Sequence, residues 1–222
     1  GFVVADVCDK GVGAALFMAL FRSLIRVFSD YADSKGTTDK ATPETEGRIY
    51  SNLDDSSSNL IPPGALKAVE LTNDYVAVNH GELVMFATLF FGVLDPATGS
   101  LHYINAGHEP LVVVNSSGGV KALLKPTAPA IGFDTDLRFG FEQIQMAPGS
   151  MLLGYTDGVS DAINSEGEFY TAEKLFSLLE QPVTSATSLM NRIVTAVESH
   201  IGEAEQHDDI TLMVICRKSS EE

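Results

Sequence analysis

Three short apolar runs in this sequence meet an aspartate at one end, and this pattern limits the possible folds more than any other feature. The runs and their acids are 3–7 with Asp6, 151–155 with Asp157, and 210–216 with Asp208 and Asp209. Short apolar runs bounded by turn residues are typical of buried strands. Because strand ends that are distant in sequence can meet at one edge of a sheet, we expect these carboxylates to converge.

Composition favours one acidic domain. The chain has 222 residues, of which 45% are hydrophobic, which is enough for a substantial single core. Its formal charge of −16, from 30 acids and 14 bases, disfavours nucleic acid as a partner. Most surplus acids are ordinary solvated surface, but inward-facing carboxylates repel one another unless a divalent cation neutralises them.

Cysteine use and hydropathy indicate a cytoplasmic domain. Cys8 and Cys216 lie in apolar contexts far apart, so we expect two buried thiols in a reducing compartment. Arg22 and Arg26 interrupt the apolar run 14–20 before it reaches the ~18 residues needed to span a bilayer. The chain begins without methionine inside an expected strand, so we expect a fragment of a longer polypeptide.

Residue periodicity predicts helices near both ends of the chain. Leu16, Leu20, Leu24 and Phe28 repeat every four residues and predict a helix over 13–28. The predicted helices after it cover 65–80, 171–180 and 185–201. Polar residues dominate 31–61, which we interpret as a mobile insertion, with a partner-docking arm as the alternative.

The pattern of apolar runs and turn residues in the middle of the chain predicts antiparallel strands. The expected strands are 85–94, 101–105, 111–114, 120–124, 137–146, 151–155 and 210–216, and turn residues join the first four into two hairpins. Helices, then strands, then helices predict an α+β fold in which two sheets are faced by helices.

Carboxylates at strand ends suit hard divalent cations, because Mg²⁺ and Mn²⁺ combine a few carboxylates with several waters. Two such ions ~4 Å apart can share an oxygen, acidify a water and clamp a phosphoryl group. Each acid alone is better explained as an ordinary turn residue, and the Asp208-Asp209 pair alone is consistent with a loop cap. The three together are far more specific.

Five ordered blocks carry a resemblance to a known family. They are 5–18 (ADVCDKGVGAALFM), 87–95 (ATLFFGVLD), 105–110 (NAGHEP), 155–159 (YTDGV) and 208–212 (DDITL). Together they resemble the bacterial metal-dependent Ser/Thr phosphatases of the RsbU and sporulation-protein-E type, which are relatives of protein phosphatase 2C. The resemblance implies an α-β-β-α sandwich of two mostly antiparallel sheets flanked by helix pairs. It also implies one phosphatase domain over 1–218, with a further strand upstream.

The same resemblance assigns roles to particular residues around two Mn²⁺ or Mg²⁺ ions. Asp6 would bridge both ions, and the Val7 carbonyl would complete one of them. Asp157 and Asp208 would hold the other, and Asp209 would orient a metal-bound water. The implied reaction is attack of metal-activated water on phosphoserine or phosphothreonine.

The resemblance also implies partners in signal transduction. The expected substrate is a phosphorylated regulatory protein, an anti-sigma-factor antagonist of a stress response, and the expected input is a sensor or receiver domain upstream in the same polypeptide. A homodimer is allowed, whereas nucleic acid and membrane are not expected. Two other readings stay open: a catalytically silent module that binds a signalling partner, and a hydrolase of small phosphate esters.

The sequence departs from the family pattern at several positions, which bears on the proton donor for the leaving group. The family usually has a Gly-Gly-Asp strand upstream, and Asp9 and Glu109 stand where glycine and asparagine are commoner. Val7-Cys8 replaces the histidine of animal relatives, so leaving-group protonation falls to a metal-bound water. His108 could act as a general acid, but its tight turn favours a structural role. Cys8 lacks surroundings that would make it nucleophilic.

Overall fold

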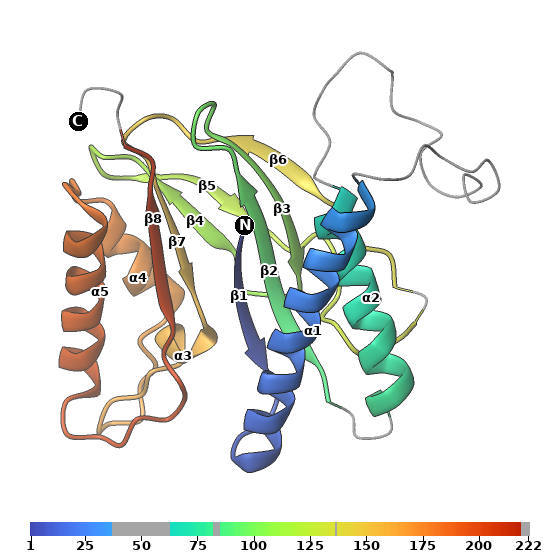
Figure 1. Ribbon diagram of the computed structural model, residues 1–222. Coiled ribbons are helices and arrows are strands. Elements are labelled where there is room, and N and C mark those ends of the chain that lie inside the picture. The colour runs from blue at the N-terminus through green and yellow to red at the C-terminus, as the bar shows by residue number, and fades with distance from the viewer. Residues whose placement is uncertain (37–62, 82–84, 136, 219–222) are drawn as a thin grey trace.

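The computed structural model describes residues 1–36, 63–81, 85–135 and 137–218, and its strands form two four-stranded sheets (Figure 1). The first sheet has the order β1 (Phe2–Val7), β2 (Ala87–Leu94), β3 (Ser100–Ala106) and β6 (Glu142–Gln145). The second has the order β5 (Val120–Leu124), β4 (Leu111–Val114), β7 (Met151–Tyr155) and β8 (Leu212–Cys216). All neighbouring strands in both sheets pair antiparallel.

Helices cover the outer faces of the two sheets. The first sheet is covered by α1 (Val12–Gly36) and α2 (Pro63–His80), and the second by α4 (Ala172–Leu179) and α5 (Ala186–Ile201) (Figure 1). A single turn, α3 (Asp157–Ser160), follows β7. The predicted α-β-β-α sandwich is therefore confirmed.

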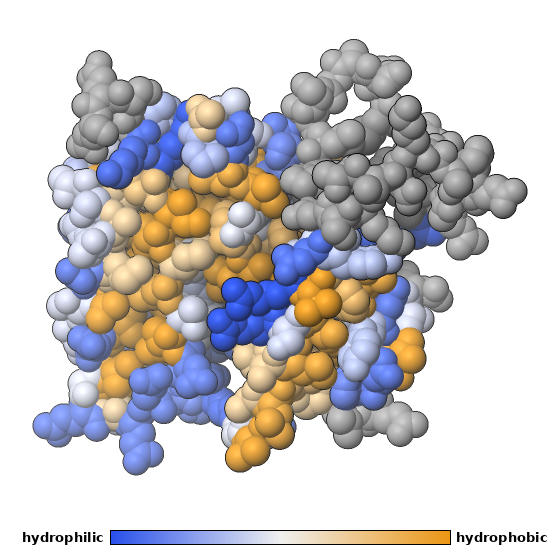
Figure 2. All heavy atoms as spheres, viewed as in Figure 1, coloured by the Kyte–Doolittle hydropathy of each residue, from blue (hydrophilic) through white to orange (hydrophobic). Residues whose placement is uncertain are grey.

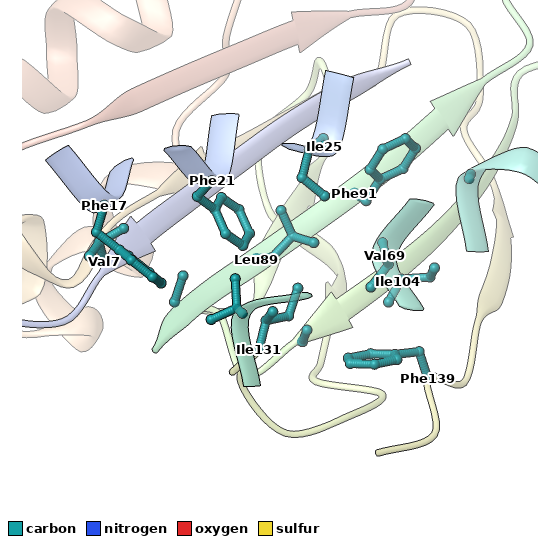
Figure 3. Close-up of a cluster of buried hydrophobic side chains, with 14 residues drawn as sticks. Val7, Phe17, Phe21, Ile25, Val69, Leu89, Phe91, Ile104, Ile131 and Phe139 are labelled. Atoms are coloured by element: carbon teal, nitrogen blue, oxygen red, sulfur yellow. The ribbon is translucent and has the colours of Figure 1, made fainter. Parts of the chain in front are cut away.

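Three apolar clusters hold the layers together. Beneath α1 and α2, Phe17 and Phe21 pack against Leu89 of β2 (Figure 3). The second cluster joins β4 and β7 to α4 and α5, and the third fills the space between the sheets around Phe90 and Tyr103. Leu89 and Phe90 are adjacent in β2 yet belong to different clusters, because successive side chains of a strand point to opposite faces.

The helix α1 is more apolar than a surface helix needs to be. By length and composition alone, its stretch Val12–Tyr31 could cross a membrane, with a mean hydropathy of 1.6 and 17% of the stretch buried. Arg22 and Arg26 thus do not interrupt the stretch enough to exclude it, contrary to the sequence-based expectation. One face of the helix packs into the first cluster through Phe17, Phe21 and Ile25.

An apolar groove runs beside α1. It has a volume of about 860 Å³ and lies along β1 and α1, with Phe2, Met18 and Met213 among its lining residues. Figure 2 shows apolar side chains gathered on this face between β8 and α1.

Some element boundaries differ from those predicted. The helix predicted over 13–28 runs to Gly36, because no glycine or proline interrupts it before that residue. The predicted insertion 31–61 therefore begins inside a helix, and its remainder lies outside the described residues. The strand predicted over 137–146 is confirmed only over Glu142–Gln145, and residues 137–141 do not pair. Phe139 packs into the first cluster instead, and the Thr127 hydroxyl donates to the Gly140 carbonyl at 2.8 Å.

Candidate active site

The strand β1 places Asp6 between the two sheets. Val7 packs into the cluster beneath α1, so the alternation of the strand directs its neighbour Asp6 to the opposite face, toward the second sheet. Asp6 lies opposite Thr88 of β2 in the ladder. A half-buried carboxylate is thereby mounted on a rigid strand.

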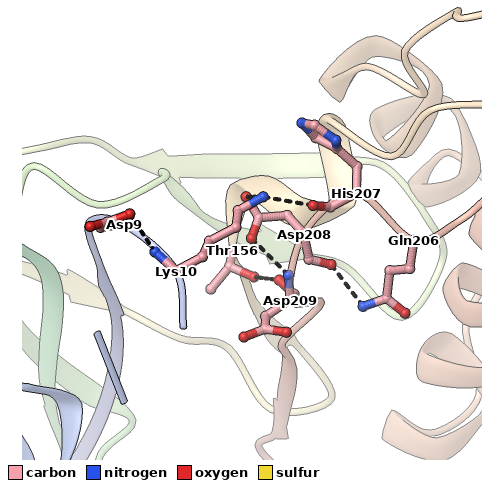
Figure 4. Close-up of polar contacts among 7 residues, drawn as sticks. All are labelled: Asp9, Lys10, Thr156, Gln206, His207, Asp208 and Asp209. Atoms are coloured by element: carbon pink, nitrogen blue, oxygen red, sulfur yellow. Dashed lines mark hydrogen bonds and ion pairs between the residues drawn. The ribbon is translucent and has the colours of Figure 1, made fainter. Parts of the chain in front are cut away.

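The second sheet brings the other acids to the same end of the molecule. Asp157 lies one residue beyond β7, after Thr156, and Asp208 and Asp209 precede β8. The buried Thr156 joins these two segments, because its hydroxyl donates to the Asp209 carbonyl at 3.2 Å and accepts from the Thr211 amide at 3.0 Å (Figure 4). The backbone amide of Thr156 also donates to the Thr211 carbonyl at 3.2 Å, and β8 begins at residue 212 rather than at the predicted 210.

Gly158 lets the two segments approach closely. A Cβ added at this position would lie 2.3 Å from the Asp209 carbonyl oxygen and 3.0 Å from its carbonyl carbon. Both contacts are with backbone, which cannot rotate away as a flexible side chain can. The separation of Asp157 from Asp208 and Asp209 therefore depends on a glycine here.

All five residues predicted from the sequence for the metal site line one cleft of about 630 Å³. They are Asp6, Val7, Asp157, Asp208 and Asp209. The loop from Cys8 to Gly11, the first turns of α1 and residues 206–207 also line it.

The acids in this cleft raise one another's pKa. Burial raises the pKa of Asp6 to about 6, and the nearby charges of Asp157 and Asp208 contribute to the rise. Burial, followed by the charge of Asp208, likewise raises the pKa of Asp157. Ionised carboxylates here repel one another, so the cleft favours a hard cation with oxygen ligands. Within the described residues, no group of three or more His, Cys, Asp or Glu side chains is arranged to hold a metal ion, so a bound ion would take several of its ligands from water.

The acidic surroundings extend beyond the predicted ligands. Burial raises the pKa of Glu109, and the charges of Asp157 and Asp161 raise it further. Sequence reasoning noted Glu109 only as a departure from the family and did not single out Asp161. Its position four residues after Asp157, one helical turn on, was the available signal.

Lys10 is the residue that sequence reasoning missed most clearly. Its Nζ lies 3.2 Å from Asp208 Oδ2 and donates to the His207 carbonyl at 2.6 Å (Figure 4). The preceding Asp9 adopts a φ of 72°, a left-handed conformation that explains why glycine is commoner here in the family that the sequence resembles. The lone base in a loop after an acid-bearing strand was the available signal.

His108 is buried, and its ring links the turn after β3 to Thr88 of β2. It is 2% exposed, and its Nδ1 shares a hydrogen bond of 2.8 Å with Thr88 Oγ1, next to Asp6 in the ladder. Burial lowers the pKa of His108 to about 4, with a smaller opposing effect from the Tyr155 backbone. The imidazole is therefore neutral near pH 7, which favours the structural role over that of a general acid.

The comparisons with known proteins point to one family. The sequence model of the family described as Stage II sporulation protein E (SpoIIE) matches residues 1–218. Protein IcfG of Synechocystis sp. is 44% identical over 218 residues, which are 97% of this chain and 33% of IcfG. The chain thus spans about a third of that curated relative.

Solved structures share the fold at low sequence identity. The SiaA-PP2C domain of Pseudomonas aeruginosa has a TM-score of 0.67 and 19% identity, and the match covers 96% of this chain and 74% of that one. The catalytic domain of the serine/threonine protein phosphatase PstP, solved with two manganese ions, has a TM-score of 0.58 and 12% identity, with 96% and 84% covered. Both share the two-sheet sandwich.

Proposed function

The chain belongs to the SpoIIE family and has the fold of PP2C-type Ser/Thr phosphatases, and on this premise we propose that it hydrolyses phosphoserine or phosphothreonine on a regulatory protein with two Mn²⁺ or Mg²⁺ ions. The observation that carries the proposal is the cleft itself. Acids from three segments far apart in the sequence line it together, and burial and mutual repulsion raise the pKa of two of them.

The donor set fits such a centre, because every predicted ligand offers oxygen. Asp6 would bridge the two ions, the Val7 carbonyl would complete one of them, and Asp157 and Asp208 would hold the other. When bound, divalent ions acidify a water molecule and neutralise charge on phosphoryl oxygens. Asp209, tied to Thr156 through its carbonyl, would orient the attacking water with its carboxylate.

The proposed substrate is an anti-sigma-factor antagonist, dephosphorylated in response to a sensor or receiver domain of the same polypeptide. The resemblance to the RsbU and sporulation-protein-E type supports this substrate class. The ordered set of acids favours catalysis over a silent binding module, because a module that only binds a partner has no need for converging carboxylates.

The experiment compares wild type with Asp157→Asn in Mn²⁺-dependent hydrolysis of an aryl phosphate and of a phosphoserine peptide. We expect the kcat of the variant to fall about 100-fold or more, because the Asp157 carboxylate that would hold one of the ions loses its charge. Glu198→Gln, which neutralises an exposed acid on α5, is the matched control and should keep the wild-type rate. An Asp157→Asn variant with the wild-type rate would overturn the mechanism.

Calorimetry separates the competing readings. Wild type should bind Mn²⁺, and no binding at millimolar metal would favour the silent module. Hydrolysis of the aryl phosphate without hydrolysis of any phosphopeptide would favour a hydrolase of small phosphate esters.

A further inference from the structure

We propose that the Lys10 ammonium occupies the place of a metal cation beside Asp208 in the metal-free protein. When metal binds, the ammonium is released from Asp208 and contacts the phosphate of the substrate. This inference deepens the proposed function and rests on it, because it takes Asp208 as a metal ligand. Lys10 would then be a substrate-binding residue supplied by the loop that follows Asp6.

The geometry places the ammonium beside a proposed metal ligand. Lys10 Nζ lies 3.2 Å from Asp208 Oδ2 and bonds the carbonyl of His207, so it joins the loop after β1 to the segment before β8 (Figure 4). Among the residues that line the cleft, Lys10 is the one lysine or arginine. Its ammonium is therefore the lysine or arginine group of the lining that can contact a phosphate.

The backbone aims the side chain into this position. Asp9 holds a φ of 72°, and its Oδ1 accepts a hydrogen bond of 2.8 Å from the Lys10 amide. A non-glycine residue in the left-handed region costs about 1–2 kcal/mol, so the direction of the loop is maintained by its surroundings.

A divalent ion displaces the ammonium for electrostatic reasons. The ion carries twice the charge, and a Mg²⁺ ion would approach a carboxylate oxygen to roughly 2.0–2.1 Å, closer than an ammonium can. The Lys10–Asp208 pair is solvent-accessible, with side-chain exposures of 56% and 36%, and pairs of this kind are weak. Once released, the flexible side chain stays at the wall of the cleft, and lysine binds phosphate as a point charge.

The test uses Lys10→Met, which keeps the length of the side chain and removes its charge. Calorimetry on the purified protein first measures the affinity for Mn²⁺, and then the affinity of the Mn²⁺-loaded protein for inorganic phosphate. We expect Mn²⁺ to bind roughly two- to fivefold more tightly, because its competitor at Asp208 is gone. Phosphate should bind about tenfold more weakly, because a charge-assisted contact is lost.

Two controls make the result specific. Lys121→Met removes the same charge from an exposed position on β5 and should change neither affinity. Lys10→Arg keeps the charge and should restore most of the phosphate affinity. If Lys10→Met leaves either affinity at the wild-type value, the inference is wrong while the proposed function stands. If wild type binds no Mn²⁺, the proposed function itself fails.

Discussion

Replacing Asp6 with asparagine should stabilise the metal-free domain, although it removes a proposed ligand of both ions. In the folded protein, burial and the neighbouring acids penalise the Asp6 charge, which raises its pKa from 3.8 to about 6. An unfolded chain imposes no such penalty. An asparagine side chain carries no charge, so the folded state loses the penalty and gains stability.

The magnitude follows from that shift. A difference of about two pKa units corresponds to about 3 kcal/mol without screening. Asp6 is only half-buried, and solvent screening reduces the effect to about 1 kcal/mol. For a domain of this size, we expect the Tm to rise by about 2–4 °C.

The sign can be checked against pH. Because the folded-state pKa is the higher one, the folded protein binds more protons than the unfolded chain between about pH 4 and pH 6, and the wild type loses stability as the pH rises through that window. The rise in Tm caused by Asp6→Asn should therefore be present at pH 7.5 and nearly absent at pH 4. Circular-dichroism melts in chelator measure it.

The same melts contain the refutation. Glu198→Gln, which neutralises an exposed acid away from the cleft, should show no pH-dependent gain of this kind. With Mn²⁺ added, the wild type should become the more stable protein, because the ion binds only its folded state with full affinity. An Asp6→Asn variant that melts below wild type in chelator at pH 7.5, or gains equally at both pH values, would refute the reasoning.

Three further substitutions follow from the contacts around the site. Gly158→Ala should weaken Mn²⁺ binding in calorimetry, since its Cβ would force the Asp209 backbone away, whereas Gly13→Ala, whose Cβ meets nothing within 4 Å, should not. Thr88→Val removes the hydrogen bond to buried His108 and should lower the free energy of unfolding in urea by about 1–3 kcal/mol. Leu89→Ala should cost about 2–5 kcal/mol in the same assay, because it leaves a cavity beneath α1 and α2, and a smaller loss would indicate that the core collapses around it.

The sequence predicted those strands whose ends are set by neighbouring turn residues. The strands 111–114, 120–124 and 151–155 were predicted with the bounds observed, because glycine, asparagine or proline marks a turn beside each. The single turn α3 was missed, since Asp157-Gly158 is equally typical of a non-helical turn. The strand predicted over 137–146 is shorter than expected, because Phe139 packs into the cluster beneath the helices and only Glu142–Gln145 pairs.

At the candidate site too, local sequence features could be predicted, whereas contacts between distant residues could not. Its acids could be found from the sequence because each stands at the end of an apolar run, and the structure brings them to one cleft. The contacts of Lys10 could not be found, because Lys10 and His207 are 197 positions apart and no periodicity links them. The partner of His108 was hidden for a related reason, since Thr88 reads only as the one hydroxyl in an apolar strand.

The wide sequence separation within the cleft has a consequence for synthesis. During translation, Asp6 and both early helices emerge long before Asp208 and Asp209 leave the ribosome. A nascent chain can therefore build its first sheet without an ion and without the repulsion that the last acids add. Under the proposed function, the cleft has its full set of acids only once β8 docks beside β7, so loading with the ions should mark a fully translated domain.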